Sequence, residues 1–425
     1  MLRAVLVFGL LAALGGIILA GPTQALTIER AVLVQRHGVR PPTSPNSALL
    51  RYSAQPWPAW PVPPGDLTEH GAKVVALMGA SLREDLTGAG LLPRTGCPAP
   101  GSVRVWADGT DERTRRSGET LGASLAPGCG LQARWAAAEL RDPIFGGSHD
   151  PACRAGAKTA KADLLAAVGP AGFVPPATRA SLDHLQAVLA PKACAGGPGL
   201  CLSGPNQVEM TSQGPRGVGP LFTAASLSED ILLEYAEGMP LDEVGWGKVR
   251  SAADVAAIMG AHGRFYQVLE KDRDLSARIG APMARLILAA LSGQAGALTG
   301  PEVHVLALAG HDDNIAVEGS IFRIAPWTLP GQPDTVSPAQ TLVFLLLNDH
   351  GRRFVRAVMA YETLDQMRDL SPAHARFLPL RFEGCSEGPM HSCPLARLAR
   401  EVAARLPAGC LGPDLALDRS VKPSS

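Results

Sequence analysis

The segment Arg36-His37-Gly38-Val39-Arg40 places a histidine between two arginines. Arginine side chains stay charged and bind phosphate oxygens through paired hydrogen bonds. Their positive charge should lower the pKa of His37 and leave a neutral ring nitrogen that can attack phosphorus. Such an attack divides phosphoryl transfer into two steps through a covalent intermediate. The segment therefore predicts a phosphate site with His37 as the nucleophile and Arg36 and Arg40 as phosphate ligands.

A second cluster, Gly310-His311-Asp312-Asp313-Asn314, carries acidic groups. A leaving alkoxide needs a proton, and a carboxylic acid with a raised pKa can supply it. We predict Asp312 as this donor, with Asp313 as the alternative, and His311 as a further phosphate ligand. The same residues also favour a simple turn. The first cluster makes the catalytic interpretation the stronger one.

A third arginine, Arg113, follows Asp111-Glu112 at the predicted start of a helix. A helix N-terminus flanked by arginines is suited to bind an anion, so Arg113 is a further candidate phosphate ligand. We assign the neighbouring Arg115 and Arg116 to the solvated face of the helix.

Apolar runs lead into all three clusters. Ala31–Val34 and Val303–Ala309 read as buried strands, and Val103–Ala107 alternates like a strand; each ends shortly before one cluster. Ligands of open α/β sheets bind at the carboxyl ends of strands. The clusters around His37 and His311 should therefore meet at one edge of a sheet.

The remaining pattern predicts an α/β fold in which a central sheet is flanked by helices and a smaller helical domain is inserted. Residues 133–258 are rich in Ala and Leu at helical spacing and form the expected insert; residues 26–132 and 259–425 form the α/β domain. Further helices are predicted at Ala72–Leu86 with Thr68 as cap, from Thr110 or Asp111 to Leu125, and at Ser251–Lys271 and Pro282–Ser292; two later strands are predicted at Leu342–Asn348 and Val355–Tyr361.

The first 25 residues read as a signal peptide. Arg3 precedes an apolar run from Ala4 to Ala20, and the small residue Ala25 is a candidate cleavage site. A membrane anchor is the alternative, but the run is slightly short for a span, and no later segment is expected to cross a bilayer. We predict a periplasmic or secreted protein that is free of the membrane once the signal is cleaved.

Charge and cysteine content fit this compartment. Lys+Arg and Asp+Glu both number 39, so no overall field favours nucleic acid, and any anion site must be local. The eight cysteines are even in number and include no C-x-x-C pair, which favours disulfides over zinc. Cys194 could pair with Cys201, and Cys385 with Cys393; the residues alone leave the other four open. We expect no metal, no cofactor and a monomer with a small-molecule partner.

Three motifs resemble those of the histidine acid phosphatases. Arg36–Thr43 resembles the signature R-H-G-x-R-x-P-T, Gly310-His311-Asp312 resembles the H-D motif, and Arg113-Thr114 with Ser117 resembles R-T-x-x-S. The likeness covers nearly the whole mature chain. Trp57–Val62, Gly238–Gly247 and Trp327–Asp334 are similar to segments of bacterial periplasmic phytases and glucose-1-phosphatases.

The resemblance implies a role for each matching residue. His37 would be the phosphorylated nucleophile and Asp312 the proton donor. The phosphate would be held by Arg36, Arg40, Arg113 and His311, with Thr43 at the mouth of the pocket and Met239 and Glu243 as candidate rim contacts. The family fold is an α/β domain with an inserted helical domain. The implied disulfides are Cys97–Cys129, Cys153–Cys410, Cys194–Cys201 and Cys385–Cys393.

The chain also departs from the resemblance at the substrate side. Bacterial phytases tend to carry a lysine where this chain has Ser44, and glucose-1-phosphatases lack the Gly-x-Arg-x-Pro-Thr form that it keeps. We predict a phosphomonoester hydrolase active at acidic pH, with phytate or a sugar phosphate as substrate. A phosphotransferase or mutase is disfavoured by the signal peptide and the His311-Asp312 pair. A non-catalytic phosphate-ester binder would need a lost catalytic residue, and none is missing.

Overall fold

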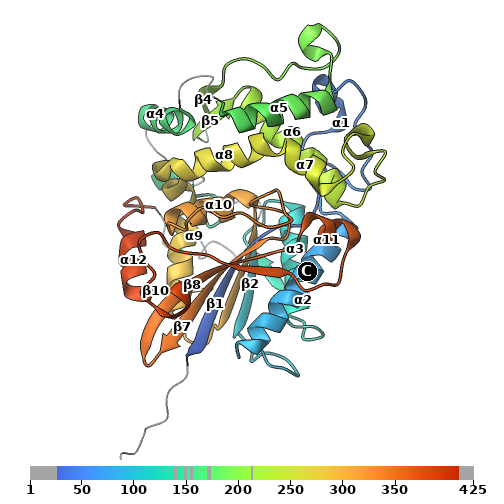
Figure 1. Cartoon of the computed structure of the whole chain (residues 1–425). Helices are drawn as coiled ribbons and strands as arrows, with labels where there is room; N and C mark the ends of the chain where they lie inside the picture. Colours follow the sequence, from blue (N-terminus) through green and yellow to red (C-terminus); the bar gives the residue numbers. More distant parts are fainter. Residues whose placement is uncertain are drawn as a thin grey trace, which may run out of the picture.

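The fold was analysed in a computed structural model that describes residues 26–137, 141–147, 151–153, 157–169, 174–211 and 214–410. The predicted signal peptide lies outside these ranges. A large mixed sheet forms the centre of the molecule, with strand order β10-β8-β7-β1-β6-β2-β3 and β9 paired to β8 (Figure 1). Its strands are β1 (Thr27–Arg36), β2 (Val103–Ala107), β3 (Ala133–Trp135), β6 (Val305–Gly310), β7 (Thr341–Asp349), β8 (Arg352–Tyr361), β9 (Arg376–Pro379) and β10 (Cys393–Pro394). The strands β1, β6, β2 and β3 run parallel to their neighbours within this set, whereas β7 to β10 pair antiparallel.

Helices cover both faces of the sheet, which explains why its central strands are apolar on both sides. Along β1, Leu33 belongs to the core beneath α2 (Glu69–Gly88) and α3 (Glu112–Leu125). Val32 and Val34 belong to the opposite core beneath α9 (Arg273–Ser292), α10 (Asp312–Ile321) and α12 (Leu395–Ala403). This alternation follows from the two-residue period of a strand. The predicted α/β class is confirmed.

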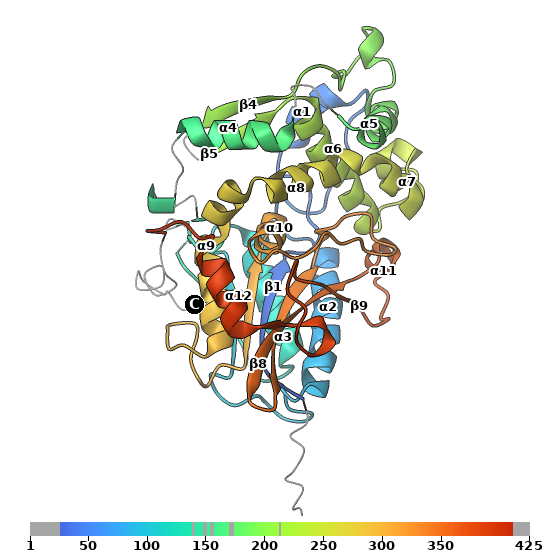
Figure 2. The same cartoon turned by 60° about the vertical axis from the view of Figure 1, so that its left-hand side comes forward.

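A helical layer lies beyond the carboxyl ends of β1 and β6 (Figures 1 and 2). It contains α4 (Ala157–Val168), α5 (Pro176–Leu189), α6 (Pro220–Ala236), α7 (Ala252–Ile258) and α8 (Gly260–Lys271), with the hairpin of β4 (Gln207–Thr211) and β5 (Gly214–Val218). The strand β3 pairs with β2 in the large sheet, and α8 packs against α5 and α6. The division at residues 133 and 258 stays a prediction, and these pairings favour a helical part that begins after β3 and includes α8.

The helix predicted at Ala72–Leu86 is slightly longer in the structure, Glu69–Gly88, and two other predicted helices differ more. The helix expected at Ser251–Lys271 is divided into α7 and α8 at Met259, because the Gly260 N–H donates to the Ser181 hydroxyl at 2.8 Å instead of continuing the first helix. The helix expected to begin at Pro282 begins at Arg273. The Asp272 carboxylate caps it, and Pro282 lies inside it. A proline removes only one helical hydrogen bond, so a well-packed helix can tolerate it.

The helix α9 bears on the expectation that no later segment is apolar enough to cross a bilayer. Among the described helices it has the length and apolar composition of a span, although no later span was expected. Within the protein, 67% of its apolar window is buried. The helix packs against α8, α10 and β1, as the core helix of a soluble protein does.

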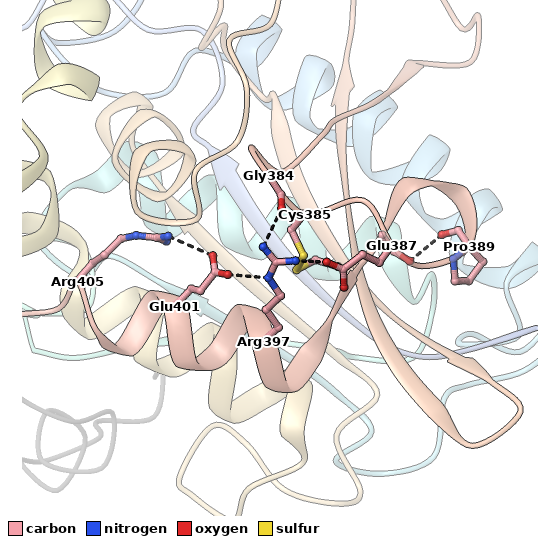
Figure 3. Close-up of a disulfide and its surroundings, with 9 residues drawn as sticks. Gly384, Cys385, Glu387, Pro389, Arg397, Glu401 and Arg405 are labelled. Carbon is pink, nitrogen blue, oxygen red and sulfur yellow. Dashed lines mark hydrogen bonds and ion pairs between the residues drawn. A yellow bond between two sulfur atoms is a disulfide. The ribbon is translucent and has the colours of Figure 1, made fainter.

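Four disulfides join the pairs that the resemblance implies: Cys97–Cys129, Cys153–Cys410, Cys194–Cys201 and Cys385–Cys393. Figure 3 shows the last of these beside α12. There Arg397 donates to Glu401 at 2.7 Å and to the Gly384 carbonyl at 2.8 Å, and it also pairs with Glu387. These contacts connect the C-terminal helix to the loop that the disulfide closes.

Candidate active site

The parallel pairing of β1 with β6 brings the two sequence clusters together. Arg36 is in register with Gly310, and the His37 N–H donates to the Gly310 carbonyl at 2.9 Å. The rings of His37 and His311 lie edge to face, with centroids 5.6 Å apart. The expected meeting of the clusters at one sheet edge is therefore confirmed.

The imidazole of His37 is buried and held in one tautomer. Its Nδ1 lies 2.8 Å from the carbonyl oxygen of Gly38. A carbonyl only accepts hydrogen bonds, so Nδ1 carries the proton and Nε2 keeps its lone pair. Burial, followed by the charges of Arg113, Arg36 and Arg40, holds the pKa of His37 well below its ordinary value. The ring is thus neutral and suited to nucleophilic attack.

The guanidinium of Arg36 is completely buried among acceptors. It donates to Asp334 at 3.1 Å and to the Val336 carbonyl at 2.6 Å, and it pairs with Asp312 at 3.0 Å and with Glu229. Burial alone would lower the pKa of Arg36, but these carboxylates raise it above its ordinary value. The charge beside the nucleophile is therefore permanent.

Glu229 joins two of the arginines and was missed by the sequence interpretation. Its carboxylate contacts Arg36, and its other oxygen lies 3.4 Å from Arg40. It belongs to α6, a helix whose side chains are buried almost all round. The acidic pair Glu229-Asp230 within such an apolar helix is the signal that could have identified it, since buried charges need partners.

The other two phosphate-ligand candidates lie near acidic groups. Arg113 pairs with Asp111 at 3.0 Å, and His311 Nε2 lies 3.0 Å from Asp108, which directly follows β2. Burial lowers the pKa of His311, but the hydrogen bond with Asp108 together with the charges of Asp313 and Asp108 raises it overall. A protonated His311 can donate to a phosphate oxygen.

Among the described residues, one group of three has the spacing of metal ligands: Asp108, Asp111 and His311, whose ligand atoms lie within 4.8 Å of one another. His311 faces both carboxylates, and Arg113 also pairs with Asp111. These cations already balance the carboxylates, so the donor set does not call for an ion.

The carboxylate of Asp312 differs from its expectation. We expected a raised pKa, yet the charges of Arg36, His311 and Arg40 outweigh the effect of burial and lower it below its ordinary value. Asp312 is therefore ionised beside Arg36. The neighbouring Asp313 behaves oppositely, because burial raises its pKa to about 6.

A cavity of about 770 Å³ opens from this cluster towards the helical layer. Arg40, Thr43, Ser44 and Asp312 form part of its lining. Further lining residues come from the 3₁₀ helix η1 (Leu50–Tyr52) and the helical layer: Arg51, Tyr52, Arg216, Phe222 and Phe265. Arg51 belongs to η1, and its guanidinium stacks on Tyr52.

The two candidate rim residues are not brought to this cavity. Met239 is buried in the core near α6, and its carbonyl accepts from Arg368 at 2.7 Å. Glu243 caps the 3₁₀ helix η6 (Val244–Gly247), and neither residue is part of the cavity lining. Residues on η1, β5 and α6 line it instead.

The sequence and the fold were compared with known proteins. The family model of the histidine phosphatase superfamily (branch 2) matches residues 27–166. The chain is 32% identical to phytase AppA of Escherichia coli K12 over 90% of its own length and 93% of that protein, and 25% identical to a glucose-1-phosphatase of Salmonella typhimurium LT2 over 90% and 94%.

Solved structures agree with the sequence comparison. The tartrate complex of Hafnia alvei phytase superposes with a TM-score of 0.84 at 31% identity, covering 91% of this chain and 98% of that one. The phytase of Citrobacter braakii gives a TM-score of 0.82 at 29% identity, covering 91% and 99%. The chain therefore belongs to the histidine phosphatase superfamily, branch 2.

Proposed function

We propose that this phosphomonoester hydrolase acts through a phosphohistidine on His37. The observation that carries the proposal is the fixed tautomer of His37, whose Nδ1–H is held by the Gly38 carbonyl among three arginines. Nε2 attacks phosphorus, the N–P bond forms, and the P–O bond to the leaving group breaks. The leaving oxygen takes a proton from Asp312. Water then attacks phosphorus and gives a proton back to Asp312, the N–P bond breaks with its electron pair returning to Nε2, and inorganic phosphate leaves.

The positive charges of the site would stabilise the transferring phosphoryl group. Arg36, Arg40 and Arg113 face the nucleophile closely enough to depress its pKa, and His311 adds a fourth donor. Such preorganised charges stabilise the equatorial oxygens of a phosphoryl transition state. The guanidinium groups supply the charge that a metal ion supplies in other phosphatases, so the reaction needs no metal or other cofactor.

The cavity lining from η1 and the helical layer favours a substrate with more than one phosphate. Arg51 and Arg216 can bind distal anionic groups, while Tyr52, Phe222 and Phe265 offer a surface for a ring. Similar proteins include phytases, and one of the similar solved structures is Hafnia alvei phytase in complex with myo-inositol hexakis sulphate. Phytate is therefore our first candidate substrate.

A sugar phosphate is the second candidate. Ser44 lines the cavity where bacterial phytases tend to carry a lysine, so the cavity offers a polyanion one cation fewer. Similar proteins also include glucose-1-phosphatases.

The chain's compartment is proposed from its leader and its disulfides. Residues 1–25 carry the features of a signal peptide, and the eight cysteines form four disulfides. Disulfides persist in oxidising compartments. We place the mature enzyme in the periplasm or outside the cell, as a monomer that binds a small phosphate ester.

His37→Ala tests the mechanism. We expect turnover of phytate, glucose-1-phosphate and a chromogenic phosphate ester to fall to background, while a chelator leaves the unmutated enzyme unchanged. The unmutated enzyme should release phosphate with water as the only acceptor of the phosphoryl group. Full activity of a folded His37→Ala protein would exclude His37 as nucleophile. Comparing kcat/KM for phytate and glucose-1-phosphate at acidic pH decides between the two substrates.

A further inference from the structure

Behind the nucleophile, a chain of buried charges extends from Arg36 into the helical layer. The Asp334 carboxylate is buried, and its Oδ2 accepts from Arg36 at 3.1 Å. Its Oδ1 accepts from the Val336 N–H at 3.0 Å and lies 3.3 Å from Nε2 of His262 on α8. Asp334 is thus shared by two cations, of which only Arg36 reaches the reacting groups.

The surroundings of His262 favour its charged form. Its Nδ1 lies 3.1 Å from the carbonyl oxygen of Ala225, which only accepts, so Nδ1 carries a proton. Its Nε2 makes no hydrogen bond but lies 3.3 Å from the Asp334 carboxylate, and although burial lowers the pKa of His262, the charge of Asp334 helps to raise it to about 9. The ring is 3% exposed and lies edge to face against Tyr266, with centroids 5.0 Å apart. A cation so deeply buried is stable only because it is paired.

Charged or titratable groups surround His262 from every neighbouring element. They are Asp334 from the loop before β7, Glu229 and Asp230 from α6, Arg36 from β1, Asp312 from α10, and Tyr266 from α8 itself. Three of these carboxylates, those of Glu229, Asp312 and Asp334, also contact Arg36. A change at His262 therefore acts on groups that hold Arg36.

We propose that His262 is a positioning residue: its imidazolium holds Asp334 and so fixes the guanidinium of Arg36 against the phosphate and Asp312. This role rests on the proposed function of Arg36 and Asp312. Without the imidazolium, Arg36 would be the only cation beside Asp334. The guanidinium would then be drawn towards that carboxylate and away from Asp312, which lies on its other nitrogen, and so from the proposed position of the phosphate.

The test compares His262→Gln with a matched control, His70→Gln. His70 on α2 also places a ring nitrogen near a backbone carbonyl, that of Met367 at 2.8 Å. It makes no described contact with the arginines of the site, Arg36, Arg40 and Arg113. We expect His262→Gln to raise both KM and the inhibition constant of inorganic phosphate, and to lower kcat/KM on the order of 10²-fold, because a small misplacement of a binding group has effects of that size. His70→Gln should stay within about twofold of the unmutated enzyme.

A purely structural role would give a different result. It would reduce the fraction of active protein, so kcat would fall while KM and the phosphate inhibition constant stayed unchanged. That outcome, or unchanged kinetics in a folded His262→Gln protein, would overturn the proposal. An unmutated enzyme without turnover, or an active His37→Ala protein, would instead overturn the proposed function itself.

A measurement on the unmutated protein covers the case in which His262→Gln does not fold. The imidazole N–H resonances of His262 should be present in the NMR spectrum at neutral pH and should shift when inorganic phosphate saturates the site, since one carboxylate separates His262 from Arg36. Resonances that do not respond to phosphate would contradict the proposed coupling.

Discussion

At the residue scale, the proposed acid Asp312 is ionised by the cations that surround it. Arg36 lies 3.0 Å from Asp312, and together with His311 and Arg40 it lowers the pKa of that carboxyl despite burial. A bound phosphate dianion would neutralise the arginines and so raise the pKa of Asp312 again. Substrate binding would thus prepare its own proton donor, most readily at acidic pH.

Asp312→Asn should show this role through the leaving group. We expect kcat to fall about 10²- to 10³-fold for phytate or glucose-1-phosphate, whose alkoxides need a proton, and far less for a nitrophenyl phosphate, whose leaving group is stable as an anion. The matched variant is Asp313→Asn. If Asp313→Asn shows the loss that depends on the leaving group and Asp312→Asn does not, the two roles must be exchanged.

The sequence predicted the residues that lie in contiguous motifs but not their partners. His37, Arg40 and Asp312 follow strands in recognisable patterns. Glu229 and Asp334, by contrast, become neighbours of Arg36 only through tertiary contacts. Their positions depend on how α6 and the loop before β7 pack, and a single sequence carries no distance between such segments. The long apolar strands could be predicted, as the motifs could, because consecutive residues alone define both patterns.

At the element scale, the first turn of α2 supports the nucleophile loop by direct backbone contact. A methyl group at Gly71 would lie 2.2 Å from the carbonyl oxygen and 2.6 Å from the nitrogen of Val39, and one at Gly38 would lie 2.4 Å from the Gly71 carbonyl oxygen. Only two glycines allow this approach. The short strands β3 and β10 escaped prediction because two or three residues carry no periodic signal.

Gly71→Ala should separate α2 from the loop that carries Arg40. We expect a loss of about 3 kcal/mol of unfolding free energy from the forced shift, together with a fall in kcat/KM. The control is Gly88→Ala in the same helix, where an added methyl group meets nothing within 4 Å. Gly88→Ala should be neutral or stabilise by up to about 1 kcal/mol, because alanine favours helix. Equal denaturant midpoints for the two variants would contradict the contact.

At the scale of the whole molecule, buried acids with raised pKa values are numerous. Burial raises the pKa of Glu234 to about 8, of Glu362 to about 8 and of Asp230 to about 7, and raises that of Glu318 well above its ordinary value. The folded protein therefore binds more protons than the unfolded chain between about pH 4.5 and 8. A group of this kind stabilises the fold fully below its unfolded pKa, and this stabilisation is lost as the pH rises through the folded pKa.

Thermal stability should consequently be higher at pH 5 than at pH 8. Below about pH 4 it should fall again, because protonation of Asp312 and Asp334, whose pKa values are lowered, breaks their pairs with Arg36. Calorimetry across this range checks the profile. Glu318→Gln removes one buried acid whose oxygens lack hydrogen-bond partners. It should reduce the difference between pH 5 and pH 8, and an unchanged difference would show that Glu318 does not contribute to it.

The place of β1 in the sheet has a consequence for how the chain folds during its synthesis. This strand comes first in the described chain, yet its two neighbours begin at Val305 and Thr341. As the polypeptide emerges, an apolar strand with both edges open must wait until most of the chain has been made before it can pair. Pairings so distant in sequence slow folding and expose the nascent chain to aggregation. Yield on export should thus depend on what protects this strand during the delay, and truncation before β6 should leave it without either partner.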